Sequence, residues 1–448
     1  MANNIDAFIP ELWAQESLAI LEENMVAANL IHRDFSNEIS SFGDVVNTRK
    51  PGEFTAKRKT NSDNVTIQDV TATNVQVLLD QHIHTSFIIK DGEESKSFKD
   101  LVNEYLNPAM LSIGRMIDQI VLGQTYHFVD NYGGSLGNLT DTNAKSYILD
   151  TRKSMNENKA YVTGRNLILS PGSETELLKL DTFITADKIG DDGTALREAS
   201  LGRKLGFDMW MCQNSAAPSA GNTTDTNGAV DGAQVKGTTA LTVNGFTGDD
   251  VSDGSWIDLG GYLYQVTASA LTGGATTQLT ITPGLKELAA DAAPISVYSP
   301  GAVNLVAGYA SGYSGPIVID GFTVAPQVGQ LVTFGTSATK YSAVETSLTS
   351  ITLDRPLEAA IANNDAVNIG PAGSYNFAFH KNALALVVRP LAQPKAGTGA
   401  LSAVANFNGL AIRVVITYDG DKQGHLVTLD LLCGIKVLDT ALGAVMLG

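Results

Sequence analysis

The chain has little cysteine and no long apolar run. Its 448 residues include only two cysteines, Cys212 and Cys433, which is typical of a protein that folds in a reducing compartment without a disulfide framework. The first residues, MANNIDAFIPELW, lack a basic segment followed by an apolar one. No stretch approaches the ~18 apolar residues that a membrane span needs. We therefore expect neither a signal peptide nor membrane insertion.

Positive charge is also scarce. Lys and Arg number 30 against 47 Asp and Glu, which leaves a net charge of −17. Proteins that hold nucleic acid by its phosphates need a surplus of basic residues, so this balance disfavours such a function. The imbalance is concentrated in residues 216–372, which contain 13 acidic and 4 basic residues. This stretch behaves as a separate compositional unit.

Motifs for catalysis and metal binding are few. There is no Walker GxxxxGK[ST] loop, no HExxH and no CxxC pair. His82 and His84 form the one close histidine pair in the sequence, and in a strand they would share one face. We interpret them as two half-exposed strand residues; a metal site is the alternative. DGDKQG at 419–424 lacks the EF-hand spacing and favours a turn over a calcium loop. We expect no catalytic, cofactor-binding or metal-binding residue and no enzyme activity.

The first 128 residues predict a helix, a strand-rich segment and a second helix. Residues 10–33 have Pro10 in the first turn and apolar residues at helical spacing. Residues 45–92 alternate apolar and polar side chains, which predicts strands with one solvated face. Residues 97–128 predict a helix that Asn107-Pro108 restarts. We expect this helix to lie across a sheet, because its apolar stripe is narrow. The stripe comprises Met110, Ile113, Ile117, Ile120, Val121 and Gln124.

The middle of the chain is different in character. Residues 160–215 predict alternating strands and helix, with NLILSP and GFDMWMCQNS as strands and ETELLKLDTFI at 174–184 as a helix. Residues 216–235 predict a linker. After residue 373 the composition returns to that of the first half, ending in a hairpin that turns at Asp419-Gly420. One domain is therefore interrupted near 216 and resumes near 373. Trp13 and Trp210 are expected in its core.

The interrupting stretch contains a repeat. VNGFTG at 243–248 returns as IDGFTV at 319–324, and similar segments follow both copies in the same order. Short alternating strands with Gly and Pro turns, in units of 60–70 residues joined at 306–315, predict two small β-barrels or sandwiches. In each copy the Asn-Gly or Asp-Gly step supplies turn chemistry. Phe246, Phe322 and Trp256 are expected inside the barrels.

One concentration of basic residues stands out. It follows the first predicted strand and includes a Pro-Gly step, as at the tip or base of an extended loop. A solvated loop is one interpretation, and a contact with the acidic surface of a neighbouring copy is the other, because complementary charge sets register between subunits. The candidate contact residues are Arg49, Lys50, Lys57, Arg58 and Lys59.

In their order along the chain, these features resemble a tailed-bacteriophage major capsid (coat) protein of the HK97-like fold, in the group of the phage P22 coat protein. NLILSP…GRKLGFDMWMCQNS resembles the family's peripheral and axial segment, FAFHKNALALVVRPL and VITYDGDKQGHLVTLDLLCGIKVLD its closing strands, and VGQLVTFGTSATKYSAV its β-barrel insertion domain. Two such units in tandem depart from that pattern. The resemblance implies an α+β chain divided into an N-terminal helical arm (1–49), an extended β loop (50–96), a spine helix with the first part of the peripheral and axial domains (97–215), inserted β-domains (216–305 and 306–372) and the completion of the peripheral and axial domains (373–448).

The resemblance also implies a function. It predicts hexamers and pentamers that close into an icosahedral shell around packaged double-stranded DNA, which is bound without sequence specificity. Scaffolding and portal proteins, and a decoration protein, would be the partners. The protein would be made and assembled in the host cytoplasm and end in the virion. We also expect the inserted β-domains to face outward, because an insertion whose two ends return to the same place lies at a surface loop. The alternatives are a tandem β-domain adhesin or carbohydrate-binding protein, and the shell of an encapsulating compartment of related fold.

Overall fold

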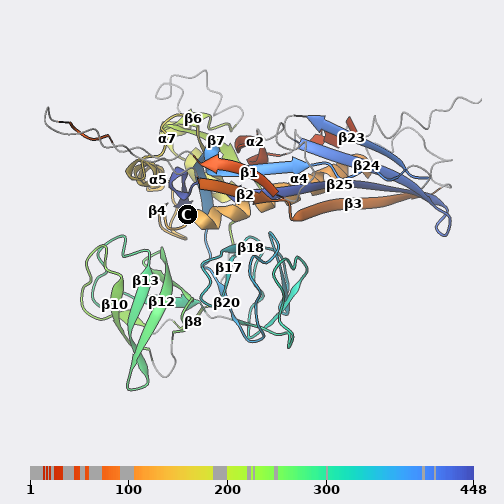
Figure 1. Cartoon of the computed structure of the whole chain (residues 1–448). Coiled ribbons are helices and arrows are strands. Elements are labelled where there is room, and N and C mark those ends of the chain that lie inside the picture. Colours follow the sequence, from red (N-terminus) through yellow and green to blue (C-terminus); the bar gives the residue numbers. More distant parts are fainter. Residues whose placement is uncertain are drawn as a thin grey trace, which may run out of the picture. The chain divides into compact units, whose positions relative to one another are not determined.

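The computed structural model describes residues 14–15, 17–18, 20–21, 25–33, 45–50, 56–59, 73–90, 105–184, 199–218, 223–225, 228–246, 251–298, 301–395, 399–407 and 410–448. The chain, whose helices and strands are labelled in Figure 1, divides into two compact units. The first comprises Met1–Ile20, His32–Ala109 and Leu384–Leu438, and the second comprises Leu21–Ile31, Met110–Ala383 and Asp439–Gly448. In the part of the chain that is described, no helix is long and apolar enough to cross a membrane.

The first unit is built on long antiparallel strands. β25 (Gly424–Val437) pairs with β3 (Gln81–Lys90), β22 (Leu384–Arg389) and β24 (Leu410–Asp419), and β24 pairs with β23 (Leu401–Phe407). The predicted turn between β24 and β25 is confirmed. There, Asp419 Oδ1 accepts hydrogen bonds from the N–H groups of Asp421 and Lys422, at 3.0 and 3.3 Å.

The strand-rich segment before the long helix is also confirmed. β1 (Val45–Lys50) and β2 (Thr73–Leu78) pair in antiparallel register, from Val45 opposite Leu78 to Lys50 opposite Thr73. β3 buries Gln81 and Ile83 and exposes His82 and His84, as strand alternation requires. Residues 51–55 and 60–72, between β1 and β2, and residues 91–104, between β3 and the long helix, lie outside the described residues. The predicted helix start at Ser97 lies in the last of these ranges.

The second unit has a six-stranded mixed sheet. Its order is β4 (Tyr132–Gly134), β26 (Gly443–Leu447), β21 (Tyr375–His380), β5 (Arg165–Leu169), β7 (Phe207–Met211) and β6 (Arg203–Lys204). β5 and β7 precede residue 216, whereas β21 and β26 follow residue 373, so the sheet joins chain segments from both sides of the interruption. One core holds this sheet to α5 (Ala144–Glu157) and α6 (Pro171–Leu178). The nested organisation is therefore present in the strand pairing itself.

Helical segments differ in detail from those expected. The helix expected over 10–33 is interrupted at Met25 and Val26, before α2 (Ala27–Leu30), and Pro10 lies outside the described residues. The segment expected as one helix, Glu174–Ile184, is α6 followed by α7 (Asp181–Ile184). Ser170, which directly precedes Pro171, caps the N-terminus of α6. Its hydroxyl accepts a hydrogen bond from the Ser173 N–H.

The long helix α4 (Asn107–Gly123) continues as the 3₁₀ helix η2 (Gln124–Phe128). A π-helical turn at Tyr105 and Leu106 precedes it directly, so the helix does not restart at Asn107. All six residues of the predicted stripe are buried. The stripe is not narrow, however, because Asp118, Leu122, Thr125 and Tyr126 on other faces are buried as well. The C-terminal half of this segment is covered all round.

The interrupting stretch forms two small β domains. The first is a seven-stranded sheet of β8 (Thr223–Asp225), β14 (Ile295–Tyr298), β11 (Trp256–Leu259), β12 (Tyr262–Thr272), β13 (Ala275–Thr282), β10 (Ala240–Asn244) and β9 (Ala229–Val230). The second is a closed barrel of β15 (Gly301–Val303), β16 (Ile317–Asp320), β19 (Ser350–Leu353), β18 (Tyr341–Thr346), β17 (Leu331–Phe334) and β20 (Ala366–Ile369). We call them the first and second barrels.

The strand pairing of the two barrels is the same. β9–β10–β13–β12–β11–β14 in the first corresponds to β15–β16–β19–β18–β17–β20 in the second. The second barrel closes through β15 and β20, and the first has an isolated bridge between Ala229 and Pro294 at the corresponding place. Loop hydrogen bonds match too: Gly237 N–H donates to Leu285 O and Gly312 N–H to Leu357 O, both at 2.7 Å. The repeat is thus one fold used twice.

The repeated phrase has the role expected of it. Gly245 and Gly321 both adopt a φ of +83°, which glycine tolerates without strain. Phe246 and Phe322 belong to the cores of their barrels. Each ring lies on a glycine of the first strand region: a Cβ at Gly228 would stand 2.0 Å from Phe246, and one at Gly301 would stand 2.1 Å from Phe322.

Five expectations change. Trp256 is buried, but it lies outside the core of the first barrel, which takes its neighbours Ile257 and Leu259; the indole N–H of Trp256 instead faces Thr333 of the second barrel at 3.4 Å. Trp210 is 46% exposed, because alternation along β7 points it away from the face that buries Phe207 and Met209. Trp13 lies outside the described residues. The linker expected at 216–235 contributes β8 and β9, and the joining segment at 306–315 places Tyr309 in the core of the second barrel. β15, which the expected boundary at 305/306 gives to the first unit, is a strand of the second.

Candidate functional site: the barrel anchors and the exposed basic run

The predicted basic run is only partly described. Arg49 and Lys50 end β1, where their backbones pair with Asn74 and Thr73. Lys57, Arg58 and Lys59 lie in an extended stretch, and all three are exposed. The structure thus places three cations in solvent and does not describe the side chains of Arg49 and Lys50. A role in contacts between copies stays a prediction.

A buried ionic cluster anchors the second barrel to the end of the long helix. Its centre is Asp354, which follows β19 directly and is 1% exposed. Asp354 Oδ1 accepts from the Ser342 N–H at 2.8 Å, and Oδ2 accepts from Arg355 Nη1 at 2.9 Å. Gln124 of η2 donates to the same Oδ2 at 3.4 Å. A Cβ at Gly123 would stand 2.6 Å from that oxygen, so the close approach of helix and barrel requires glycine there.

Arg355 is saturated with partners. Its Nε donates to Glu358 at 3.1 Å, and its Nη2 donates to the Lys340 carbonyl at 2.6 Å and to Nε2 of His127 at 2.9 Å. Its guanidinium carbon lies 4.5 Å from the centre of the Tyr341 ring. Burial disfavours the charged guanidinium, but the Asp354 and Glu358 carboxylates outweigh this and raise the pKa of Arg355. Arg355 therefore stays charged.

The contact with His127 specifies a protonation state. A guanidinium has only donors, so the imidazole nitrogen that faces Arg355 must be the acceptor, and His127 of η2 is neutral with its proton on Nδ1. Two further contacts complete the anchor. Tyr126 of η2 donates to the Gly329 carbonyl, and Lys340 Nζ lies 3.5 Å from Asp130 Oδ1.

The first barrel is held by other means. Lys286 Nζ donates to the Asp130 carbonyl at 3.2 Å and lies 4.4 Å from the centre of the Tyr132 ring. The Leu136 N–H donates to Gly261 O at 2.7 Å. Leu285 and Leu357 accept equivalent hydrogen bonds in the two barrels, so the segment TPGL of the first barrel aligns with DRPL of the second. The ion pair between Asp354 and Arg355 therefore occurs only in the second of the two aligned segments. An alignment of the two repeats could have revealed this difference from the sequence.

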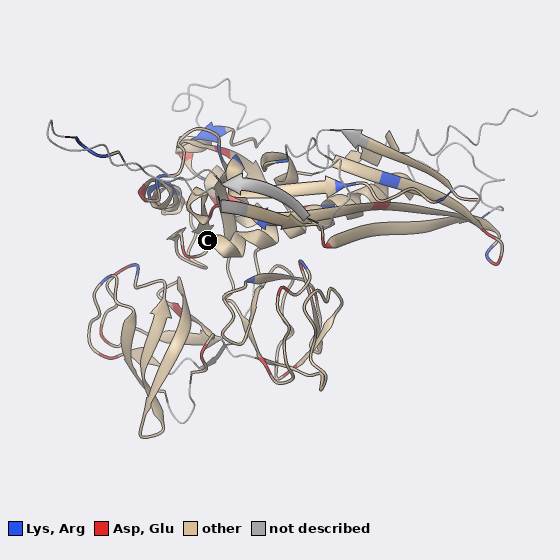
Figure 2. Cartoon of the chain, viewed as in Figure 1, with Lys and Arg blue, Asp and Glu red and all other residues tan. Residues whose placement is uncertain are grey.

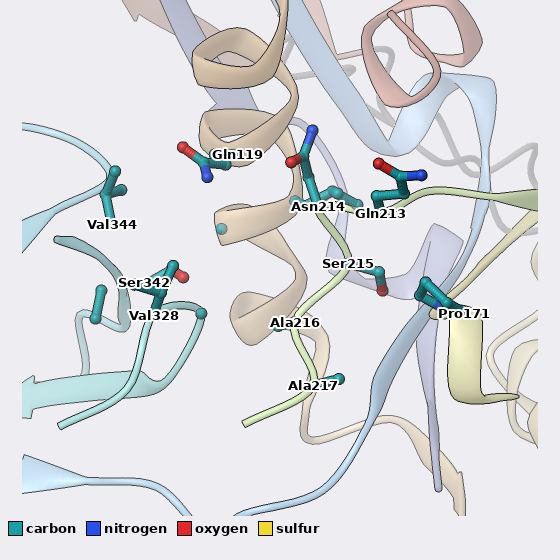
Figure 3. A pocket seen from close by; sticks show the side chains of 14 residues that line it. Gln119, Pro171, Gln213, Asn214, Ser215, Ala216, Ala217, Val328, Ser342 and Val344 are labelled. Atoms are coloured by element: carbon teal, nitrogen blue, oxygen red, sulfur yellow. The ribbon is translucent and has the colours of Figure 1, made fainter. Parts of the chain in front are cut away.

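A cavity of about 260 Å³ lies beside this anchor (Figure 3). Its walls are α4, the segment 213–217 and the second barrel. The polar groups are amides and hydroxyls, and the Ser215 Oγ is buried without a partner in the described part of the chain. Among the described residues that line it there is no Asp, Glu, His, Cys, Lys or Arg. Its labelled walls include Gln119, Gln213, Asn214, Ser215, Ser342 and Val344.

Three other groups could suggest chemistry. GGSLG at 133–137 has the GxSxG spacing, but the hydroxyl of Ser135 lies 2.6 Å from that of Tyr147, and no imidazole is placed beside it among the described contacts. Cys212 donates to Asp118 at 3.9 Å, yet burial raises the pKa of its thiol to about 11 and keeps it protonated. Neither is an activated nucleophile.

The exposed histidine pair is likewise unlike a metal site. The ring centres of His82 and His84 are 5.9 Å apart. The carboxylate closest to them in the strand pairing, Asp430, lies 3.5 Å from His82 but is held by both Nε and Nη2 of Arg413. Among the described residues no three His, Cys, Asp or Glu side chains are grouped as metal ligands.

No protein-family model matches the chain, and no curated protein sequence matches it. Solved structures do. A chain of Mycobacterium phage Che8 is 14% identical with a TM-score of 0.46, over 94% of this chain and 90% of that one. A chain in the capsid structure of the cyanophage P-SCSP1u is 10% identical with a TM-score of 0.45, over 94% and 87%. One in the asymmetric unit of the bacteriophage PhiM1 mature capsid is 10% identical with a TM-score of 0.40, over 91% and 82%. Because these three scores are below 0.5, the likeness by itself assigns neither fold nor function.

Proposed function

We propose that the chain is the major capsid protein of a tailed bacteriophage, with the HK97-like fold and two tandem β-domains inserted in it. One observation carries the proposal: the order of elements that the resemblance implies is the order that the chain has. A β1–β2 ribbon precedes the long helix α4, a sheet is begun by β5 and β7 and completed by β21 and β26, and two barrels interrupt it.

The proposed activity is assembly without catalysis. Copies of one chain form hexamers and pentamers through heterologous contacts and close into an icosahedral shell around double-stranded DNA. The β1–β2 ribbon would extend over a neighbouring subunit, and its basic run, Arg49 to Lys59, would contact the neighbour's acidic surface. An acidic chain suits a container for DNA, because a lining that gripped phosphate would hinder packaging and release.

The two barrels would face outward. Figure 2 shows where Asp and Glu lie along their strands and loops. The role of the barrels would be to brace the shell domain and to contact neighbours or a decoration protein. Scaffolding and portal proteins are the further partners that we propose. The protein would be synthesised and assembled in the host cytoplasm and reside in the virion.

Electron microscopy of the negatively stained full chain, expressed alone and with the scaffolding protein of its phage, tests the proposal. We expect closed shells or their capsomers. A stable monomer or dimer under every condition would contradict the assignment. Nuclease-protected DNA in particles from infected cells would separate a viral shell from an encapsulating compartment, which would hold protein cargo instead.

A further inference from the structure

A buried guanidinium lies at the start of β5 without a counter-ion. Arg165 is 1% exposed, and no carboxylate contacts it among the described residues. Its Nε donates to Tyr161 O at 2.5 Å and its Nη2 to Ala160 O at 2.8 Å, while Nη1 has no partner in the described part of the chain. Left-handed backbone at Lys159 and Gly164 turns this loop around the guanidinium. A buried charge without an anion is costly, so the site is incomplete.

The described groups around Arg165 do not neutralise it. His380 of β21 pairs with Arg165 in strand register, and burial together with Arg165 lowers the pKa of its imidazole, which favours the neutral form. Burial and the nearby Arg152 of α5 lower the pKa of Arg165 itself. β6 at the edge of the same sheet consists of Arg203 and Lys204 (Figure 2), and the carboxylate that β7 offers, Asp208, is already paired with Arg203 at 3.7 Å. In the described part of the chain, the sheet end therefore offers Arg165 no carboxylate partner.

The rim of this site has the composition of a protein contact. Tyr161 is 62% exposed and Val162 is 59% exposed, and the Tyr161 ring centre lies 5.1 Å from that of His380. Exposed tyrosine beside arginine is enriched where proteins bind one another. We name Arg152, Tyr161, Val162, Arg165 and His380 the sheet-end patch.

We propose that the sheet-end patch binds an Asp or Glu side chain of a second copy of this chain. The occupant follows from three observations. Nη1 of Arg165 is buried and has no partner in the described part of the chain, and a carboxylate is the anion whose geometry matches a guanidinium. The exposed rim is apolar and aromatic and suits a protein surface better than a phosphate backbone. The chain itself is rich in the required group, with 47 acidic residues against 30 basic ones. The inference rests on the proposed function in one respect: it requires that copies of the chain contact one another.

Charge reversal at the edge of the patch tests this inference. Arg152→Glu should lower shell yield about tenfold or more, because it sets a like charge against the incoming carboxylate. Arg152→Gln should have a smaller effect in the same direction. Lys153→Glu is the matched control: it makes the same charge change one residue along α5, on a side chain that is 66% exposed, and should leave the yield within about twofold. Thermal unfolding of each variant separates assembly from folding.

Photo-cross-linking identifies the occupant. With benzoylphenylalanine in place of Tyr161, we expect a cross-link to an acidic peptide of another copy. Cross-linking to DNA, or Arg152→Glu shells that form as well as Lys153→Glu shells, would overturn the inference and leave the shell function standing. If the wild-type chain forms no shells but forms dimers that Arg152→Glu abolishes, the shell function fails and the patch stands. A wild-type chain that is monomeric throughout contradicts both.

Discussion

Arg355 donates to Nε2 of His127 across 2.9 Å, and so joins the loop after β19 to the 3₁₀ end of the long helix. The second barrel is thereby fixed at a charged group that has no counterpart in the first. Both barrels share strand order and core positions, but this anchor distinguishes them. Substitution of a single charged residue in this anchor should therefore change the free energy of unfolding of the second barrel.

Arg355→Met should destabilise the protein by about 3–5 kcal/mol, because it leaves Asp354 buried and unpaired. Urea unfolding measures this. Glu358→Gln, which removes the partly exposed partner of Arg355, should cost less than ~1 kcal/mol. The double variant Asp354→Leu with Arg355→Met should recover part of the loss, since no charge then remains buried. A cost for Arg355→Met as small as that of Glu358→Gln would show that the anchor contributes little.

His127 should tolerate a neutral acceptor and reject a cation. His127→Gln can keep an acceptor toward Arg355, whereas His127→Lys sets a second positive charge against the guanidinium. We expect the lysine variant to lose about 2 kcal/mol more than the glutamine variant. Equal losses would mean that only the volume of the side chain matters, and thermal unfolding of the two proteins side by side decides.

Gly228→Ala and Gly301→Ala should each destabilise their barrel by about 1–3 kcal/mol, because the new methyl group collides with the ring of Phe246 or Phe322. Gly172→Ala in α6 is the control; it meets nothing within 4 Å and should be neutral or slightly stabilising. Tolerance of alanine at either barrel glycine, measured by urea unfolding, would contradict the packing described for that ring.

Asp118 should make stability depend on pH. Burial raises the pKa of its carboxyl above the unfolded value, although the N–H groups of Val26 and Ala28 oppose this. Its contribution is fully present below the unfolded pKa, about 3.9, and is lost as the pH rises through the higher folded pKa. The stability of the wild type relative to Asp118→Asn should therefore increase as the pH falls from 7 toward 4. A difference that moves the other way in urea titrations would mean that the folded pKa is depressed.

Both cysteines should be inert in the folded protein. Burial raises the pKa of Cys212 to about 11 and that of Cys433 to about 12, so at pH 8 the reactive thiolate is on the order of a thousandth of Cys212 or less. Iodoacetamide should label neither thiol in native protein and both after denaturation, as mass spectrometry can count. Rapid labelling of native Cys212 would instead indicate that the segment around it opens readily.

The repeat, the strand periods and the turn glycines were predictable because local chemistry decides them. Gly245 and Gly321 have a positive φ, as glycine in a turn often does, and Phe246 and Phe322 are the large apolar residues beside them. Trp210 was placed wrongly because a strand's period of two does not say which face another layer covers. The breadth of burial on α4 was missed for the same reason: it depends on chain segments that arrive from far along the sequence.

The candidate sites were harder to predict than the fold. Arg355, His127 and Asp354 are 228 residues apart at their extremes, and nothing local marks them as partners. The sequence around Arg165 is that of an ordinary strand start. Only the structure shows that the loop at 159–164 surrounds its guanidinium. The basic run at 49–59 was visible at once as a charge pattern, and its role is a matter for the experiments on assembly.

The pairing of β5 with β21 has a consequence for synthesis on the ribosome. Ser170, just after β5, bonds to Asn376 of β21, 206 residues later. At ~5–20 residues per second, β5 emerges and then waits about 10–40 s for its central partner strand. Both barrels emerge in that interval, each with a core of its own and only local strand pairings to make. Translation thus delivers the two inserted domains first, and the sheet that they interrupt is completed only when the last eighth of the chain has been made.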